Sequence, residues 1–386
     1  MLFNVWNSWD PLKVVMLGNV HPIEFYRDLK DDKVRDPLCR ITEETQKDLE
    51  NFKNVLKDFG CKVIQMNPST DENLFEYIEN KKLAKQGIGI RNALQPRDAQ
   101  LVLGNKLYIT APDNREILNQ IKSYVNGKFE DLIIHPDIMK DKHYIPAPCI
   151  TQVGKDLYID LLWEEEKNDT CVIGFRLLGD GPEILMNGPI TDWFKKVAPG
   201  YRYHEIEIGG HNDGCFCVLK PGALLTTTYF TKYEKSFPGW DVLELEENHA
   251  GFPANKQHIK DGKKIWGLPA HEAKKKHLVK VEGKWWIPGE EENDVLRHFV
   301  GKYLTDWVGD MQESIFDVNV LVLDKNTVCV PNKCDVAYEF YKKHKMEPIH
   351  VPFRHKWFWD AGLHCITLDL FRYGKQEDYF PEREEL

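Results

Sequence analysis

The chain has 386 residues, of which 42% are hydrophobic and 12% aromatic, so it holds enough apolar material for a sizeable core. Its net charge of −10 is spread along the sequence, which argues against nucleic acid as the main partner. No apolar run approaches the roughly 18 residues of a membrane span, and the N-terminus lacks a signal-peptide pattern. Nine cysteines without a repeated CxxC favour a reducing compartment. We expect a soluble, cytoplasmic protein that acts on small molecules.

The first elements predicted along the chain are a strand, an amphipathic helix and a second strand. The apolar run Lys13–Leu17 ends in a Gly-Asn turn and predicts a short buried strand. Apolar residues at helical spacing predict a helix over Thr42–Phe59, with Gly60 as its stop. A strand over Lys62–Met66 follows.

One pattern then recurs four times: two apolar runs separated by a turn of Gly, Pro-Gly or Asp-Lys-Asn. Because a helix and a strand follow the first and the last hairpin, the repeating unit is hairpin, helix, strand. The strands Lys13–Leu17 and Cys365–Phe371 are left over, and together they can complete a fifth unit that closes a ring. The spacing favours a closed array of ββαβ units in one domain, residues 1–386. The hairpins are Leu101–Thr110, Ile150–Asp160, Phe216–Thr226 and Asn319–Val330; the helices are Arg115–Val125 and Val336–Lys345; the strands after them are Asp131–His135 and Pro348–Phe353.

A segment before the fourth hairpin, residues 246–312, interrupts the repeat. It is rich in charged residues, Gly and Pro, and then predicts a small hairpin over His277–Pro288 and a helix over about Glu291–Val308. Because a structureless loop of this length is improbable in a compact domain, we expect an ordered insertion. A lid and an oligomer contact are both compatible with the sequence, and so is a homodimer.

Polar residues precede corresponding strands of the repeat. Asp98 comes before the first hairpin, His211 and Asp213 before the third, and Cys365 opens the last strand. If the repeats surround an axis, these residues converge. Two carboxylates can then grip a planar guanidinium through paired hydrogen bonds while the thiolate adds to its central carbon. His211 would protonate the departing amine and deprotonate the next nucleophile.

The next nucleophile decides the reaction class: an amine makes the enzyme an amidinotransferase, and water makes it a deiminase or dihydrolase. Structural roles compete with this interpretation, because Cys365 fits a core cysteine and the other three fit turn or capping residues. His364 should point to the opposite face from Cys365 and is interpreted as structural. The pair Cys215-x-Cys217 lacks a second ligand pair, so a zinc site is not expected.

Four motifs follow one another along the chain: Asn7-Ser8-Trp9-Asp10-Pro11-Leu12, Pro96-Arg97-Asp98, His211-x-Asp213 and Gly362-Leu363-His364-Cys365-x-Thr367-x-Asp369. Through them the chain resembles the arginine:glycine and inosamine amidinotransferases of the guanidine-modifying pentein superfamily. The resemblance implies an α/β five-bladed ββαβ propeller without a metal or organic cofactor. It also implies arginine as donor, Cys365 as the nucleophile that accepts the amidino group, His211 as acid and base, and Asp98 and Asp213 as guanidinium ligands.

The sequence departs from that family at two places. Where the family has a further catalytic acid, an ungapped alignment places Pro146 and a gapped one Thr151, while Asp160 and Glu164 are nearby acids. A missing acid would leave His211 without its orienting carboxylate, which keeps open a catalytically impaired guanidine-binding protein. Where glycine-using members carry an Arg, the chain reads Thr-Tyr-Phe at 228–230, which disfavours glycine and leaves the acceptor amine unknown.

Overall fold

The computed structural model places most of the predicted repeat and leaves parts of the chain undescribed. The described residues are 2–65, 67–68, 73–76, 93–109, 121, 123–126, 132–134, 147–160, 190–206, 208, 211–227, 230, 232–245, 289–290, 292–304 and 315–383. The predicted hairpin His277–Pro288 and most of the predicted helix Arg115–Val125 lie outside these ranges. Pro146 and Glu164 lie outside them as well.

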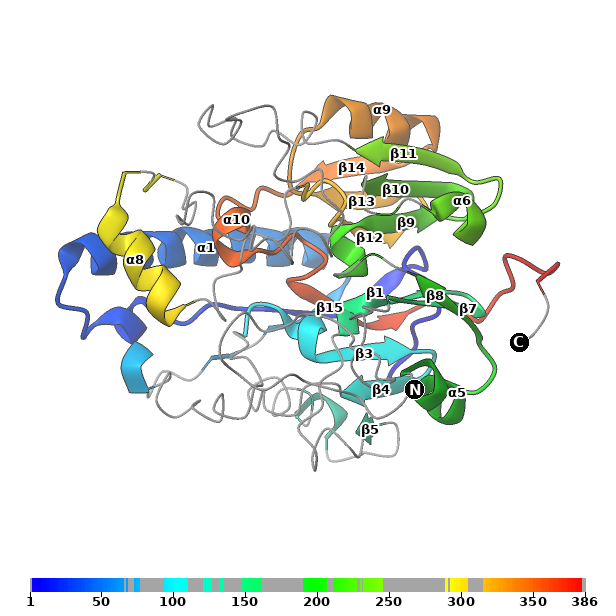
Figure 1. Cartoon of the computed structure of the whole chain (residues 1–386), viewed down its shortest axis with the longest axis horizontal. Coiled ribbons are helices and arrows are strands. Elements are labelled where there is room, and N and C mark those ends of the chain that lie inside the picture. Colours follow the sequence, from blue (N-terminus) through cyan, green and yellow to red (C-terminus); the bar gives the residue numbers. More distant parts are fainter. Residues whose placement is uncertain are drawn as a thin grey trace, which may run out of the picture.

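The described strands form five three-stranded sheets (Figure 1). In each sheet the middle strand pairs antiparallel with one neighbour and parallel with the other, which is the hairpin-then-strand unit predicted from the sequence. The four predicted hairpins are confirmed. Their sheets are β3 (Gln100–Leu103), β4 (Lys106–Ile109) and β5 (Leu132–Ile134); β6 (Ile150–Val153), β7 (Asp156–Asp160) and β8 (Arg202–Ile206); β9 (Phe216–Lys220), β10 (Ala223–Thr227) and β11 (Asp241–Leu245); and β12 (Leu321–Asp324), β13 (Thr327–Val330) and β14 (Glu347–His350).

The fifth sheet joins the two ends of the chain. Strand β15 (Thr367–Arg372) runs antiparallel to β1 (Leu12–Leu17), and β1 runs parallel to β2 (Lys62–Gln65). The backbone N–H of Asn4 also donates to the carbonyl of Leu370 at 3.1 Å. The fifth unit expected from the two unpaired strands is therefore confirmed.

The long helix α1 (Asp32–Asp58) begins ten residues before its predicted start at Thr42. Asp31 caps it, because its Oδ1 accepts from the backbone N–H of Lys33 at 3.0 Å. Pro37 lies inside the helix and removes one backbone hydrogen-bond donor. In a sequence, a proline usually predicts the end of a helix. Burial of the apolar face of α1 outweighs that loss.

The other described helices are α5 (Ile190–Val197), α6 (Tyr233–Ser236), α8 (Asp294–Tyr303), α9 (Asp335–Lys343) and α10 (Lys356–Trp359). Three short 3₁₀ turns precede first strands of the sheets: η3 (Pro96–Ala99), η4 (Ala147–Cys149) and η5 (Asn212–Gly214).

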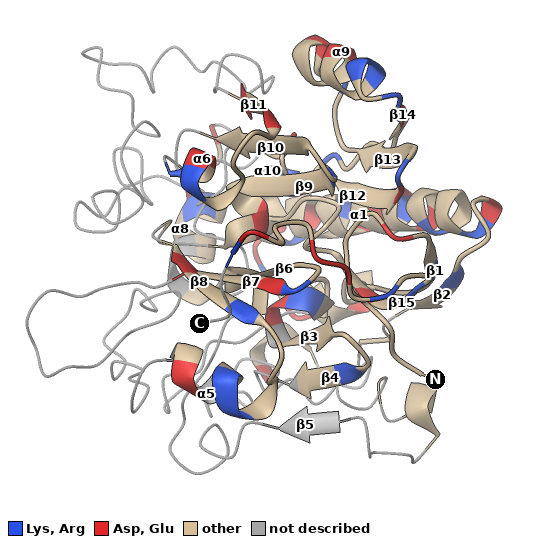
Figure 2. Ribbon diagram, turned by 90° about the vertical axis from the view of Figure 1, so that its right-hand side faces the viewer, with Lys and Arg blue, Asp and Glu red and all other residues tan. Residues whose placement is uncertain are grey.

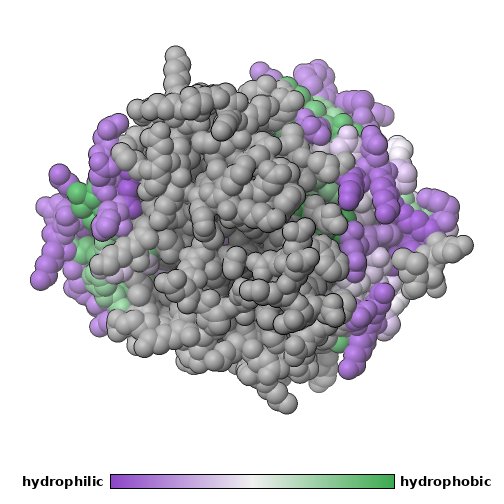
Figure 3. Space-filling view, viewed as in Figure 1, coloured by the Kyte–Doolittle hydropathy of each residue, from purple (hydrophilic) through white to green (hydrophobic). Residues whose placement is uncertain are grey.

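Charged residues are frequent on the helices. Figure 2 marks Lys, Arg, Asp and Glu residues along α1, α5, α6 and α9, whereas most of the ribbon of the strands belongs to other residues. Helix α8, in the described part of the predicted insertion, lies against α1 and carries the apolar side chains Val295 and Tyr303, which are 38% and 36% exposed. Figure 3 shows hydrophobic residues among hydrophilic ones at the end of the molecule where α1 and α8 lie in Figure 1. Within the described ranges, no helix combines the length and the apolar character that a membrane crossing requires.

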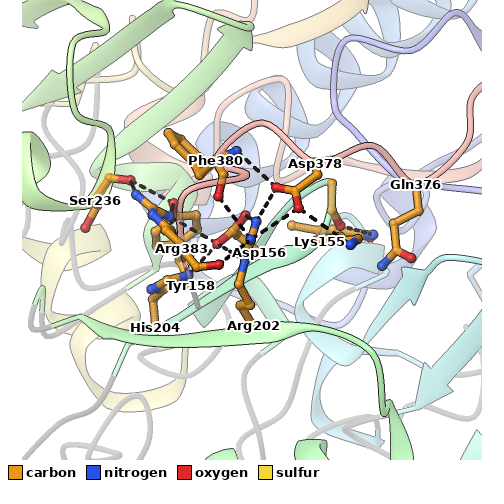
Figure 4. Close-up of polar contacts among 12 residues, drawn as sticks. Lys155, Asp156, Tyr158, Arg202, His204, Ser236, Gln376, Asp378, Phe380 and Arg383 are labelled. Atoms are coloured by element: carbon orange, nitrogen blue, oxygen red, sulfur yellow. Dashed lines mark hydrogen bonds and ion pairs between the residues drawn. The ribbon is translucent and has the colours of Figure 1, made fainter. Parts of the chain in front are cut away.

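The C-terminal strap, residues 373–383, lies along β7 and β8 (Figure 4). Arg202 in β8 forms ion pairs with Asp156 in β7, at 2.8 Å, and with Asp378 of the strap. Its Nη1 donates to the carbonyl of Phe380 at 3.0 Å, and Arg383 donates to Asp156 at 3.1 Å. The end of the chain is therefore fixed to the second sheet through a buried carboxylate.

Replacement of Asp156 by asparagine is expected to lower the free energy of unfolding by about 3–5 kcal/mol at pH 7, because buried guanidinium groups lose their counter-charge. Burial raises the pKa of Asp156, but hydrogen bonds from His204 and Arg202 outweigh it and lower the pKa below its usual value. The stabilisation is thus present at neutral pH and lost as the pH falls through that lowered pKa. Urea unfolding followed by tryptophan fluorescence measures it. The exposed Glu382→Gln, in the same strap, is the control, and equal effects would contradict the prediction.

Candidate active site

Cys365 lies in a tight turn over residues 363–366 directly before β15. The sequence predicted it as the first residue of the strand, and this is corrected: β15 begins at Thr367. The turn is closed by Thr367, whose Oγ1 donates to the carbonyl of Leu363 at 2.9 Å. A residue of a turn can present its side chain in a direction that strand alternation does not allow. The Cys365 side chain is buried at this position, with 1% exposed.

Arg97 ties the segment that carries Asp98 to this turn. Its Nε donates to the carbonyls of His364 and Thr367, each at 3.0 Å, and Nη2 lies 3.3 Å from Oδ1 of Asp369. Burial raises the pKa of Asp369, but Arg372, Arg97 and His364 outweigh it and lower the pKa to about 2. Asp98, the next residue of η3, is almost fully buried. Because Arg97 contacts the turn that carries Cys365, the adjacent Asp98, a predicted guanidinium ligand, is held beside that turn.

Asp213 contacts both Cys365 and its neighbour. Its Oδ2 lies 2.7 Å from Nδ1 of His364 and 3.4 Å from Sγ of Cys365. Burial raises the pKa of Asp213, but the hydrogen bond from His364 and the charges of His364, His211 and Arg97 outweigh it, so the pKa lies below its usual value. An ionised carboxylate only accepts hydrogen bonds. The Cys365 thiol and Nδ1–H of His364 therefore both donate to the same oxygen.

The orientation of His364 corrects the sequence interpretation. Alternation along a strand placed it opposite Cys365, but the turn brings both side chains to Asp213. Burial and the charge of Arg97 lower the pKa of His364, against the raising effects of Asp213 and Asp369. The imidazole is then neutral near pH 7, and the hydrogen on Nδ1 leaves the lone pair on Nε2.

His211 directly precedes η5, the turn that holds Asp213, and its side chain is half-buried. A positive charge on His211 lowers the pKa of Asp213. Asn212 anchors η5 to the second sheet, because its Nδ2 donates to Thr151 Oγ1 at 3.1 Å and to the Tyr158 carbonyl at 3.3 Å. The structure thus brings His211, Asp213 and Cys365 into one region.

Thr151, which is no acid, and the nearby acid Asp160 both have other contacts. Thr151, at the gapped position, accepts from Asn212, and Oδ1 of Asp160 accepts from the backbone N–H of Ile208 at 2.7 Å. Asp160 therefore holds the segment that leads to His211. Beside Cys365, the carboxylate of Asp213 is paired with an imidazole, that of His364.

Sequence reasoning missed one further residue of the site, Asn319. It lies two residues before β12, and its Nδ2 is 2.8 Å from Sγ of Cys365. The sequence placed Asn319 as the first residue of the fourth hairpin, but β12 begins at Leu321. Asn319 is therefore a polar residue just before a hairpin of the repeat and obeys the rule that identified Asp98 and Asp213. That rule could have found it. Among the described residues, no group of three or more His, Cys, Asp or Glu side chains is placed to hold a metal ion.

No protein-family model matches the sequence, and no curated protein matches it. SxtG, an amidinotransferase from Microseira wollei in the saxitoxin biosynthetic pathway, is similar in structure, with a TM-score of 0.59, 17% identity and coverage of 98% of this chain and 99% of that chain. The inosamine-phosphate amidinotransferase StrB1 from Streptomyces griseus is similar too, with a TM-score of 0.59, 16% identity and coverage of 98% and 99%. The chain shares the fold of these amidinotransferases.

A hydrolase has this fold as well. DDAH from Pseudomonas aeruginosa, solved in complex with citrulline, is similar with a TM-score of 0.51 and 10% identity, over 92% of this chain and 98% of that chain. The α/β pentein fold predicted from the sequence is therefore confirmed. Because one fold serves several reactions, the reaction has to be argued from the site.

Proposed function

We propose that the protein is an amidinotransferase that takes the amidino group of arginine through a covalent adduct on Cys365. The observation that carries this proposal is the contact of the Cys365 thiol with the ionised Asp213, beside two imidazoles. A buried carboxylate next to a thiol favours a cationic substrate, because the guanidinium supplies the missing counter-charge. The shared fold with amidinotransferases supports the same reaction.

In the first half of the reaction, Asp98 and Asp213 hold the guanidinium and His211 takes the thiol proton. The Cys365 sulfur then forms a bond to the guanidinium carbon. The bond from that carbon to the arginine side-chain nitrogen breaks, and His211 returns the proton to this nitrogen as ornithine leaves. In the second half an amine loses a proton to His211 and forms a bond to the amidino carbon. The carbon–sulfur bond breaks, and the sulfur recovers the proton.

We also propose that the five sheets surround one axis as the blades of a propeller. Each of the segments η3, η4 and η5 precedes the first strand of its sheet, as Asn319 and the Cys365 turn precede theirs. The segment η4 lies against both η3 and η5, and η3 lies against β15. A closed ring accounts for this convergence. In this arrangement residues 1–386 form one domain, with 246–312 as an insertion.

The acceptor is proposed to be an amine other than glycine. Phe230, the described residue of the Thr-Tyr-Phe stretch, is 2% exposed, and its ring lies 4.7 Å from that of Phe216. An apolar ring has no charge to pair with the carboxylate of glycine. An acceptor panel should therefore contain glycine beside amines that carry no carboxylate.

Incubation with arginine is expected to give more than one equivalent of ornithine per protein only when an amine of this panel is added, because the adduct needs an amine to release the amidino group. Amino-acid analysis by mass spectrometry measures ornithine, citrulline and urea in parallel. Citrulline or urea formed without any amine would instead support a hydrolase, the reaction class suggested by the shared fold with DDAH. Lysine in place of arginine is the control, since it lacks a guanidinium and should give no product.

A further inference from the structure

We propose that Asn319 positions the Cys365 side chain and stabilises its thiolate through a hydrogen bond from the amide. The inference rests on the proposed function only in taking Cys365 as the nucleophile. Asn319 is fully buried and lies two residues before β12, which belongs to a different sheet from the one that Cys365 adjoins. Asn319 therefore connects two sheets beside the proposed nucleophile.

The orientation of the Asn319 amide follows from its other hydrogen bonds. Its Oδ1 accepts from the backbone N–H of His364 at 3.0 Å and from that of Cys365 at 3.1 Å. A backbone N–H only donates, so the atom that faces these two groups has to be the carbonyl oxygen. The amide nitrogen consequently faces Sγ of Cys365, at 2.8 Å. A flipped amide would place donors against donors, so the N–H directed at sulfur is fixed.

The backbone fixes the same pair of segments. The N–H of Leu363 donates to the Asn319 carbonyl at 3.1 Å. Gly362 leaves the space that Asn319 fills, because a Cβ at this position would stand 2.5 Å from Cβ and from Oδ1 of Asn319. Any larger residue at 362 would therefore displace the asparagine. The Gly362 position of the sequence motif is explained by this close approach.

Asn319 and Asp213 act on the sulfur in opposite directions. Asp213 accepts from the thiol, and its negative charge opposes a thiolate 3.4 Å away. The Asn319 N–H donates toward sulfur and favours the thiolate, since hydrogen bonds to charged groups are stronger than those to neutral ones. Without the Asn319 N–H, the negative charge of Asp213 is expected to dominate the electrostatic environment of the sulfur. The pH at which Cys365 ionises should then rise.

The experiment is the pH dependence of Cys365 alkylation by iodoacetamide, measured on the peptide that contains Cys365 by mass spectrometry. Only the thiolate reacts, so the midpoint reports its ionisation. Asn319→Asp is isosteric and keeps oxygens for both backbone donors, but it loses the N–H and adds a negative charge. We expect its midpoint to lie about 1–2 pH units or more above that of the unmodified protein, and Asn319→Ala to shift it upward by less.

Gly362→Ala keeps the Asn319 side chain but displaces it, so this substitution should also shift the Cys365 midpoint upward. If the Asn319 variants fail to fold, Gly362→Ala provides the test. Cys39, on α1, is the internal control within every sample, and its midpoint should not move. Unchanged Cys365 midpoints in variants that keep the native circular dichroism spectrum would overturn the proposal. Because no arginine or amine is present, failure of amidino transfer and failure of this inference remain distinguishable.

Discussion

Cys365→Ala is expected to abolish the covalent adduct that arginine forms with the protein and to lower ornithine formation by about 10⁴-fold or more, because the reaction loses the atom that carries the amidino group. Intact-mass spectrometry after mixing with arginine, without an amine, detects the adduct as the mass of one amidino group. A stable adduct on Cys365 would contradict a protein that only binds guanidines.

The control for this substitution is Cys39→Ala, since Cys39 lies on α1 and is partly buried. It should form the adduct at the rate of the unmodified protein. Ornithine formation that survives in Cys365→Ala would exclude covalent transfer through this residue. The reaction would then have to proceed by direct attack of the amine on the bound guanidinium.

Asp213→Asn is expected to lower kcat/KM for arginine by about 10³-fold, the effect of removing one partner from a buried charge pair. The substitution keeps the size of the side chain but removes the charge that would hold the guanidinium and the acceptor for Nδ1–H of His364. The pKa of Asp213 lies below its usual value because the hydrogen bond from His364 and nearby positive charges outweigh the effect of burial. The carboxylate is therefore ionised throughout pH 5–9, so the loss of activity is expected over this whole range.

Steady-state kinetics with varied arginine concentration test this prediction, with the exposed Glu339→Gln on α9 as the control. If Asp213 only capped its loop, the variant would lose stability while its KM for arginine stayed normal. A thermal melt measured on the same preparations separates these outcomes. A normal kcat/KM in Asp213→Asn would remove this residue from the list of guanidinium ligands.

Much of the fold could be predicted because its signals are local. Each hairpin is specified by two apolar runs and the turn residues between them, as at Gly104 and Gly154, which adopt positive φ angles of 59° and 58°. The pairing of β1 with β15 spans most of the chain, yet it followed from two strands that belonged to no predicted hairpin. The start of α1 did not follow, because Pro37 reads as a helix breaker and only burial of the helix face overrides it.

The sequence predicted which residue types form the candidate site, but it predicted their contacts in space less well. Asp98, Asp213, His211 and Cys365 were identified because polar residues at equivalent places of a repeat converge when the repeat closes. His364 was misinterpreted, because strand alternation does not hold in the turn that carries Cys365. Its contact with Asp213 depends on where two sheets meet, which no local pattern encodes.

The turn that carries Cys365 depends on both local sequence and tertiary contacts. The sequence by itself determined the repeating unit, the residue types before each first strand and the thiol among them, since these depend on neighbours along the chain. Only the tertiary structure decided that Asp213 accepts from both Cys365 and His364, and that Asn319 directs an N–H at the sulfur. The physical reason is that hydrogen bonds and pKa values depend on distances of a few ångströms between segments that lie 45 to 152 positions apart in the sequence.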